Sequence, residues 1–141
     1  MPERKFTPGL GLIKGSDLKK SSIYGLAFWV GLCLGAAFIG SLITAPATPG
    51  WYQTLQKPDW TPPDWVFGPV WTALYLMMAI AAWRVWMKSP ISRVPIMAFL
   101  AQLFLNVGWT VIFFGFKSPG IAFSEIIVLW AAILVTILQF R

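Results

Sequence analysis

Three side chains in a long apolar run could together hold a ligand. Gln102, Asn106 and Trp109 lie four and three residues apart within the uncharged stretch 94–116. In an α-helix this spacing places them on one face, and polar side chains in hydrocarbon normally face the interior of a helix bundle. They could hydrogen-bond neighbouring helices, or they could anchor a ligand in a mostly apolar pocket. From these residues alone the first interpretation is favoured.

Aromatic residues that could stack on a flat ligand gather earlier in the chain. Six of the nine Trp fall within 51–86, and six of the 11 Pro fall within 46–69. Proline fixes φ and removes a backbone donor, so the loop 46–65 should be stiff and cannot form a regular helix. A rigid aromatic loop could cover a cavity, or it could form an aromatic belt at the membrane interface. Composition does not separate these alternatives. The residues concerned are Trp51, Tyr52, Trp60 and Trp65.

Two further features lie inside apolar runs. Trp71 and Tyr75 are one helical turn apart directly after the loop, where they could line a pocket or simply pack. Glu125 is the only acid within a predicted span, and an intramembrane carboxylate is a functional candidate. It could couple protons in a small transporter, or it could cap the first turn of its helix, where the helix dipole favours a negative charge. We favour a structural role for Glu125.

The elements that must position these residues are apolar helices. Four runs with one charge or none approach the roughly 20 residues needed to cross a bilayer. They predict an all-α integral membrane bundle with a basic N-terminal tail at 1–22 and a transmembrane domain at 23–141. The predicted spans are 23–45, 66–87, 94–116 and 119–140, and the loop 46–65 is the predicted lid.

Composition excludes several other classes of protein. Only 11% of the residues are charged and 57% are hydrophobic, whereas a soluble domain carries about 25% charged residues. The single Cys and the absence of His rule out an intrachain disulfide, a cysteine cluster for zinc and imidazole catalysis. The net charge of +6 comes from patches beside apolar runs, which indicates membrane topology and no nucleic-acid partner. We expect no metal site and no required cofactor.

The distribution of Lys and Arg predicts an orientation. The tail, the region 84–93 and the end of the chain carry most of the positive residues, whereas the loop 46–65 has only Lys57. The positive-inside rule therefore puts the N-terminus in the cytoplasm and the loop outside. We expect a multi-pass protein of a bacterial inner (plasma) membrane, with an outer or organelle membrane as the alternatives.

Three stretches resemble one known family. They are Trp51-Tyr52-x-x-Leu55-x-Lys57-Pro58-x-Trp60-Thr61-Pro62-Pro63-x-Trp65-Val66-Phe67-x-Pro69-x-Trp71-x-x-Leu74-Tyr75, Gln102-Leu103-x-x-Asn106-x-x-Trp109 with Phe113-Phe114-Gly115, and Pro119-Gly120-x-Ala122-x-x-Glu125. Together they closely resemble the TspO/translocator protein family, the tryptophan-rich sensory proteins or peripheral-type benzodiazepine receptors. The match is gapless and built from rare residues, and it covers roughly residues 23–141.

The resemblance implies a membrane receptor, usually a homodimer, with a pocket in each protomer below the loop. It implies porphyrin ligands (protoporphyrin IX and haem) and a role in tetrapyrrole or stress regulation. In the family, the residues matching Trp71 and Asn106 hydrogen-bond ligand carbonyls. The expected ligand-binding residues are Trp51, Trp60, Trp65, Trp71, Tyr75, Asn106 and Trp109. Gln102 and Glu125 are expected to be structural or proton-linked, and no catalytic residue is expected.

The resemblance also leaves alternatives. Some family members promote light-dependent breakdown of porphyrins, so a porphyrin-degrading enzyme with a pocket Trp as redox partner is a second hypothesis. A small transporter using Glu125 is the third. The family fold has five helices, of which this sequence contains four. We expect the sequence to be truncated; a shortened variant that fills the gap by oligomerising is the alternative.

Overall fold

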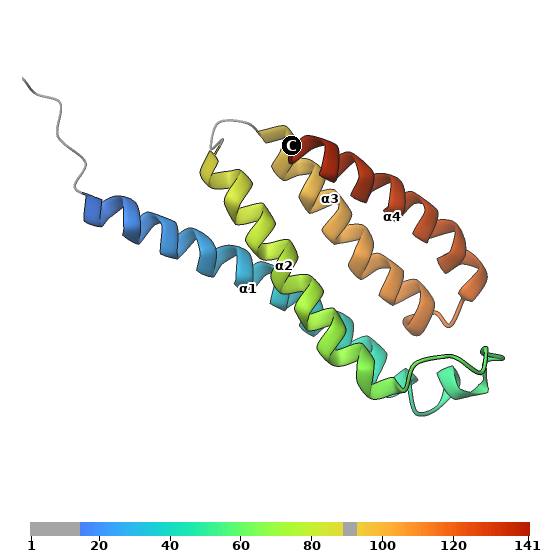
Figure 1. Cartoon of the computed structure of the whole chain (residues 1–141). Coiled ribbons are helices and arrows are strands. Elements are labelled where there is room, and N and C mark those ends of the chain that lie inside the picture. Colours follow the sequence, from blue (N-terminus) through green and yellow to red (C-terminus); the bar gives the residue numbers. More distant parts are fainter. Residues whose placement is uncertain (1–14, 89–92) are drawn as a thin grey trace, which may run out of the picture.

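Four long helices make up the computed structural model, which describes residues 15–88 and 93–141. They are α1 (Gly15–Ala47), α2 (Phe67–Lys88), α3 (Arg93–Thr110) and α4 (Pro119–Gln139). Figure 1 shows α2, α3 and α4 running lengthwise beside one another, with the first part of α1 extending away from them. Each is long and apolar enough to cross a membrane, and the described residues contain no strand. The prediction of an all-α membrane bundle with four spans is therefore confirmed.

The ends of the first helix extend beyond its apolar run. α1 begins at Gly15, inside the stretch expected as a tail, because a helix can continue past the hydrocarbon into the headgroup region. The predicted tail residues 1–14 lie outside the described residues. Three short turns complete the fold, namely the 3₁₀ turns η1 (Trp51–Thr54) and η2 (Asp64–Val66) in the loop and the π-helical turn η3 (Val111–Gly115) after α3.

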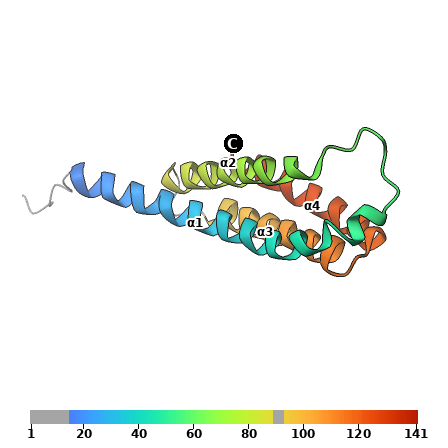
Figure 2. The same cartoon turned by 90° about the horizontal axis from the view of Figure 1, so that it is seen from below.

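The helices pack as two pairs, which contact each other through α3. α1 packs along α2, α3 packs along α4, and α1 also contacts α3. Figures 1 and 2 show the α3–α4 pair beside the α1–α2 pair, with the loop 48–66 at one end of the bundle. α2 also contacts α3, so both helices of the first pair pack against the second pair.

Small buried residues bring α1 and α2 close together. Cys33, Ala79 and Ala82 are completely buried, and small side chains at such positions let helix backbones approach in a bilayer. At the far end of the same interface, the Trp83 Nε1–H donates to the Ser22 carbonyl oxygen at 3.0 Å. The α1–α2 pair is thus fixed both by close packing and by a hydrogen bond.

Phe99 joins the two pairs. It is 2% exposed, lies edge-on to Trp29 of α1 with ring centroids 5.6 Å apart, and stacks on Phe140 after α4 at 6.0 Å. The outward faces carry large apolar side chains such as Phe104 and Trp130. Hydrocarbon is the solvent for a membrane bundle, so an apolar exterior of this kind is expected.

Candidate ligand-binding site

The polar centre of the bundle is a hydrogen bond between α2 and α3. The Tyr75 hydroxyl donates to Asn106 Oδ1 at 3.1 Å, and the two residues are 4% and 8% exposed. Gln102, one turn before Asn106 on α3, is also buried. In hydrocarbon an unpaired polar group is costly, so this hydrogen bond satisfies the Tyr75 hydroxyl and the Asn106 side-chain carbonyl oxygen and holds α2 against α3.

Trp71 extends this polar centre toward the outside of the bundle. Its ring lies 6.0 Å from that of Tyr75 at an interplanar angle of 40°, and its side chain is 37% exposed. The indole therefore offers an accessible face and an N–H donor beside a buried hydroxyl and amide. A flat, partly polar ligand could stack on such a face while its polar groups find donors.

Aromatic rings dock the start of the loop on the end of α3. Trp51 lies edge-on to Phe113 with centroids 5.4 Å apart, and Tyr52 contacts Phe114 at 5.7 Å. Trp109 stacks on Phe113 at 4.9 Å with an interplanar angle of 13°. These five rings form what we call the loop-anchoring cluster, which connects the loop to the same helix that carries Asn106.

The π turn explains why two consecutive Phe both reach the loop. The Phe116 N–H donates to the Val111 carbonyl oxygen at 2.9 Å, five residues back, instead of the four of an α-helix. This widened turn changes the direction of the side chains that follow Thr110. Phe113 and Phe114 can then contact the loop together, their own centroids lying 4.8 Å apart.

Polar contacts close the loop on itself. Gln53 Nε2 donates to Asp64 Oδ2 at 2.6 Å, and Lys57 Nζ donates to Gln53 Oε1 at 3.1 Å. The Lys57 ammonium also lies 4.0 Å from the centre of the Tyr52 ring, within cation–π range. Gln53 thus joins the two 3₁₀ turns of the loop.

Burial raises the pKa of the Tyr52 hydroxyl, and the nearby Asp64 carboxylate raises it further.

Replacing Gln53 with alanine is expected to loosen the loop, because one substitution removes both of these side-chain hydrogen bonds. Amide hydrogen exchange over 51–66 in detergent micelles should become about fivefold to tenfold faster. Gln56→Ala is the matched control, since Gln56 is exposed and takes no part in these contacts. Equal exchange rates for the Gln53→Ala protein and the unmodified protein would show that the aromatic contacts alone hold the loop.

The structure does not bring every expected site residue together. Trp60 and Trp65 are 83% and 74% exposed and form none of the ring contacts described above. Trp51, Trp71, Tyr75, Asn106 and Trp109 occupy one half of the bundle, between the polar centre and the loop.

Two surface hollows lie elsewhere. One of about 450 Å³ lies between the end of α2 and Phe140, and one of about 410 Å³ lies within the loop around Gln53 and Asp64. Neither is lined by Trp71, Tyr75 or Asn106.

Glu125 does not cap its helix. α4 begins at Pro119 and has no acid in its first turn, so Glu125 is nearly two turns into the helix. Both of its carboxylate oxygens are buried and have no hydrogen-bond partner among the described residues. Capping was the structural role weighed for this residue, and the helix start rules it out because the free N–H groups lie within the first turn.

Sequence reasoning did not assign a site role to several residues that hold the loop. Phe113 and Phe114 come four and five residues after Trp109, about one helical turn further along the chain. An aromatic pair at this spacing indicates a second set of rings that can contact the loop. Gln53 and Asp64 are 11 residues apart, and no local pattern links them. Their contact depends on how the prolines fold the loop back.

Comparison with known proteins gives one consistent result. Residues 29–141 match the model of the TspO/MBR family. Among the relatives, the Tryptophan-rich protein TspO of Chlorobaculum tepidum is 43% identical over 122 residues, which cover 84% of this chain and 77% of the relative. The Tryptophan-rich sensory protein of Cereibacter sphaeroides is 40% identical over 68% of this chain and 65% of its own length.

The human Translocator protein is 37% identical over 99 residues, 67% of this chain and 59% of its own length. The family match at residues 29–141 includes the loop, the polar centre and the loop-anchoring cluster. The four apolar helices and the family match together identify an integral, multi-pass membrane protein, and this chain belongs to the TspO/MBR family.

Proposed function

We propose that this chain is a membrane receptor or sensor that binds porphyrins, such as protoporphyrin IX and haem, and related hydrophobic ligands. The observation that carries the proposal is the buried Tyr75–Asn106 hydrogen bond with the accessible Trp71 ring beside it. This arrangement offers a stacking surface and hydrogen-bond donors in an apolar surrounding. Relatives named as tryptophan-rich sensory proteins support a sensing role, here in tetrapyrrole or stress regulation.

The loop has a defined part in this function. Trp51 and Tyr52 anchor it on the end of α3, and in this proposal the loop covers the end of the bundle nearest Trp71 and Asn106. A ligand with carboxylates could be held below the loop by Trp71, Asn106 and Trp109. We further propose a homodimer in a bacterial inner membrane, as the family resemblance suggests. The distribution of Lys and Arg favours a cytoplasmic N-terminus.

Trp71→Ala is expected to weaken protoporphyrin IX binding about fivefold, because the variant loses the stacking surface and the indole donor. Fractional quenching of Trp fluorescence, titrated in the dark in detergent, gives the dissociation constant. Trp130→Ala is the matched control, because Trp130 is 68% exposed on α4 and has no part in the site.

Two outcomes would change the assignment. Identical titration curves for Trp71→Ala and the unmodified protein would remove Trp71 from the site. Loss of protoporphyrin absorbance under illumination, absent in the dark and reduced in Trp71→Phe, would instead favour the porphyrin-degrading alternative.

A further inference from the structure

One acidic side chain has its carboxyl group inside the packed part of the bundle. Glu125 is the only charged residue of α4, and both of its carboxylate oxygens are buried without a hydrogen-bond partner among the described residues. A further helix packed on the outside of the bundle could not contact these oxygens, because the described residues already cover them. The surroundings of this carboxyl group are therefore set within the described bundle.

Glu125 lies on the face of α4 that packs against α3 and η3. The buried residues of α4 are Ala122, Leu129 and Thr136. Glu125 is three residues after Ala122 and four before Leu129, so it belongs to the same face of the helix. Because α4 packs against α3 and η3, this face is directed toward them.

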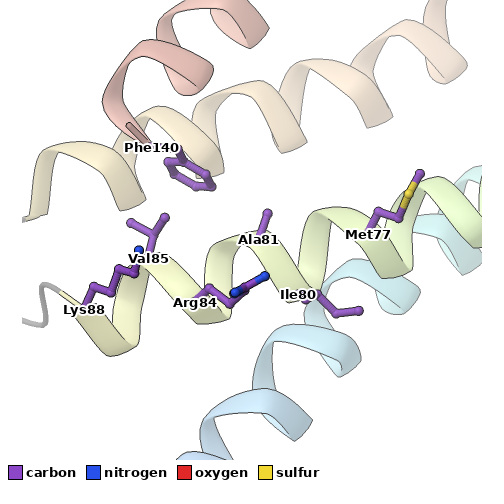
Figure 3. A pocket seen from close by; sticks show the side chains of 7 residues that line it. All are labelled: Met77, Ile80, Ala81, Arg84, Val85, Lys88 and Phe140. Atoms are coloured by element: carbon purple, nitrogen blue, oxygen red, sulfur yellow. The ribbon is translucent and has the colours of Figure 1, made fainter.

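The position of Glu125 along α4 is level with η3. α3 and α4 run in opposite directions (Figure 1), and Phe140, which projects from the end of α4 (Figure 3), stacks on Phe99. Glu125 lies 15 residues before Phe140, and the same distance beyond Phe99 reaches Phe114. Counted instead from the turn that joins η3 to α4, Glu125 lies opposite about Trp109. The stretch between these two residues carries the α3 and η3 rings of the loop-anchoring cluster.

None of the described residues around Glu125 supplies a positive charge for a carboxylate. α3 has one charged residue, Arg93 at its first position, and η3 has none. Lys117, in the turn before α4, is exposed. The other described charged residues lie in the loop or at the ends of α1, α2 and α4 remote from it, and they are Asp17, Lys19, Lys20, Lys57, Asp59, Asp64, Arg84, Lys88 and Arg141.

The protonation state decides what this carboxyl group can bind. An isolated buried charge is costly, and such groups neutralise instead. An ionised carboxylate only accepts hydrogen bonds, whereas the neutral acid also donates one through its O–H. The side chains of η3 are all apolar, so its backbone is the polar group that it offers. The last carbonyl groups of a helix have no partner within the helix, so the neutral acid fits η3 and the carboxylate does not.

We propose that Glu125 is a neutral carboxylic acid whose O–H donates to a backbone carbonyl oxygen of η3, and that this contact positions Phe113 and Phe114 for the loop. Glu125 is then a positioning residue, which acts through η3 and does not contact the ligand. The inference rests on the proposed function only for the role of the loop as the cover of the ligand site. Because its tests use no porphyrin, it can fail while porphyrin binding is confirmed, and it can hold where porphyrin binding fails.

Infrared spectroscopy of the full chain in detergent tests the protonation state. The sequence has only five acidic residues, and acids exposed to water are ionised at about pH 7. We expect one carbonyl stretching band of a neutral carboxylic acid. Glu125→Gln should abolish this band, and Asp59→Asn, which removes an exposed acid of the loop, should leave it unchanged. Absence of the band, or its persistence in Glu125→Gln, would overturn the proposal.

Amide hydrogen exchange tests the positioning role. Glu125→Leu keeps a similar size but has no donor. The Phe116 and Ser118 N–H groups, whose hydrogen bonds close the end of η3, should then exchange about fivefold to tenfold faster. The loop amides at 51–66 should also exchange faster, because the rings that hold the loop follow η3. Glu125→Gln keeps an N–H donor and should stay within about twofold of the unmodified protein.

Ser124→Leu is the matched control for the exchange experiment, because Ser124 is the preceding residue of α4 and is exposed. This control should leave exchange in η3 and in the loop unchanged. If Glu125→Leu exchanges like the unmodified protein, Glu125 does not hold η3. If Glu125→Gln exchanges as fast as Glu125→Leu, donation by a neutral group is not what holds η3. Either result would overturn the proposal.

Discussion

Phe99→Ala is expected to lower the free energy of unfolding by about 3 kcal/mol, the lower end of the range for Phe truncation in a packed core. Lipid tails are as apolar as the side chain, so the transfer part of the loss is small in a membrane and the packing part remains. Phe99 is 2% exposed and contacts Trp29 and Phe140. Its removal therefore leaves a void where the two helix pairs meet.

Unfolding in mixed micelles with increasing sodium dodecyl sulfate, followed by circular dichroism, measures the effect. Phe104→Ala is the matched control, because Phe104 lies on the same helix and is 78% exposed. If Phe104→Ala lowered the free energy of unfolding as much as Phe99→Ala, the contact between the two helix pairs at Phe99 would add no stability beyond the effect of the substitution on helix propensity.

Asn106→Ala is expected to weaken protoporphyrin IX binding about tenfold or more, the largest effect on binding among the site residues. The substitution removes a ligand donor and also leaves the buried Tyr75 hydroxyl without its acceptor, at a cost of about 1–3 kcal/mol. The same variant should lower stability, because it breaks the hydrogen bond between α2 and α3. Titration of the folded variant separates the two effects.

Comparison with Tyr75→Phe distinguishes direct binding of the ligand by Asn106 from a purely structural role of the Tyr75–Asn106 hydrogen bond. Tyr75→Phe removes the hydrogen bond and leaves the Asn106 amide in place. If Asn106 binds the ligand itself, Tyr75→Phe should lower stability like Asn106→Ala but keep most of the affinity. If the two variants lose both stability and affinity equally, the hydrogen bond between α2 and α3 accounts for the loss, and no separate contact of Asn106 with the ligand is supported.

The helices were predictable from the sequence, because uncharged runs of about 20 residues leave few alternatives in a chain with 11% charged residues. The common face of Gln102 and Asn106 was also predictable, since it depends only on helical periodicity. The pairing of Tyr75 with Asn106 was not predictable from the sequence, because packing determines how far two helices are shifted relative to each other along their axes. Composition alone could not tell that Trp51 is docked and Trp60 exposed, since both are Trp in the same loop.

The π turn at Val111–Gly115 makes the contact between loop and α3 sensitive to the number of residues. Each residue of an α-helix turns the chain by about 100°, so deletion of one residue here would restore regular geometry and rotate the following rings away from Trp51. Single substitutions would keep the residue count and leave this dependence undetected. The segment should therefore tolerate changes of side chain better than changes of length, even though it lies at the end of a helix, where insertions are usually harmless.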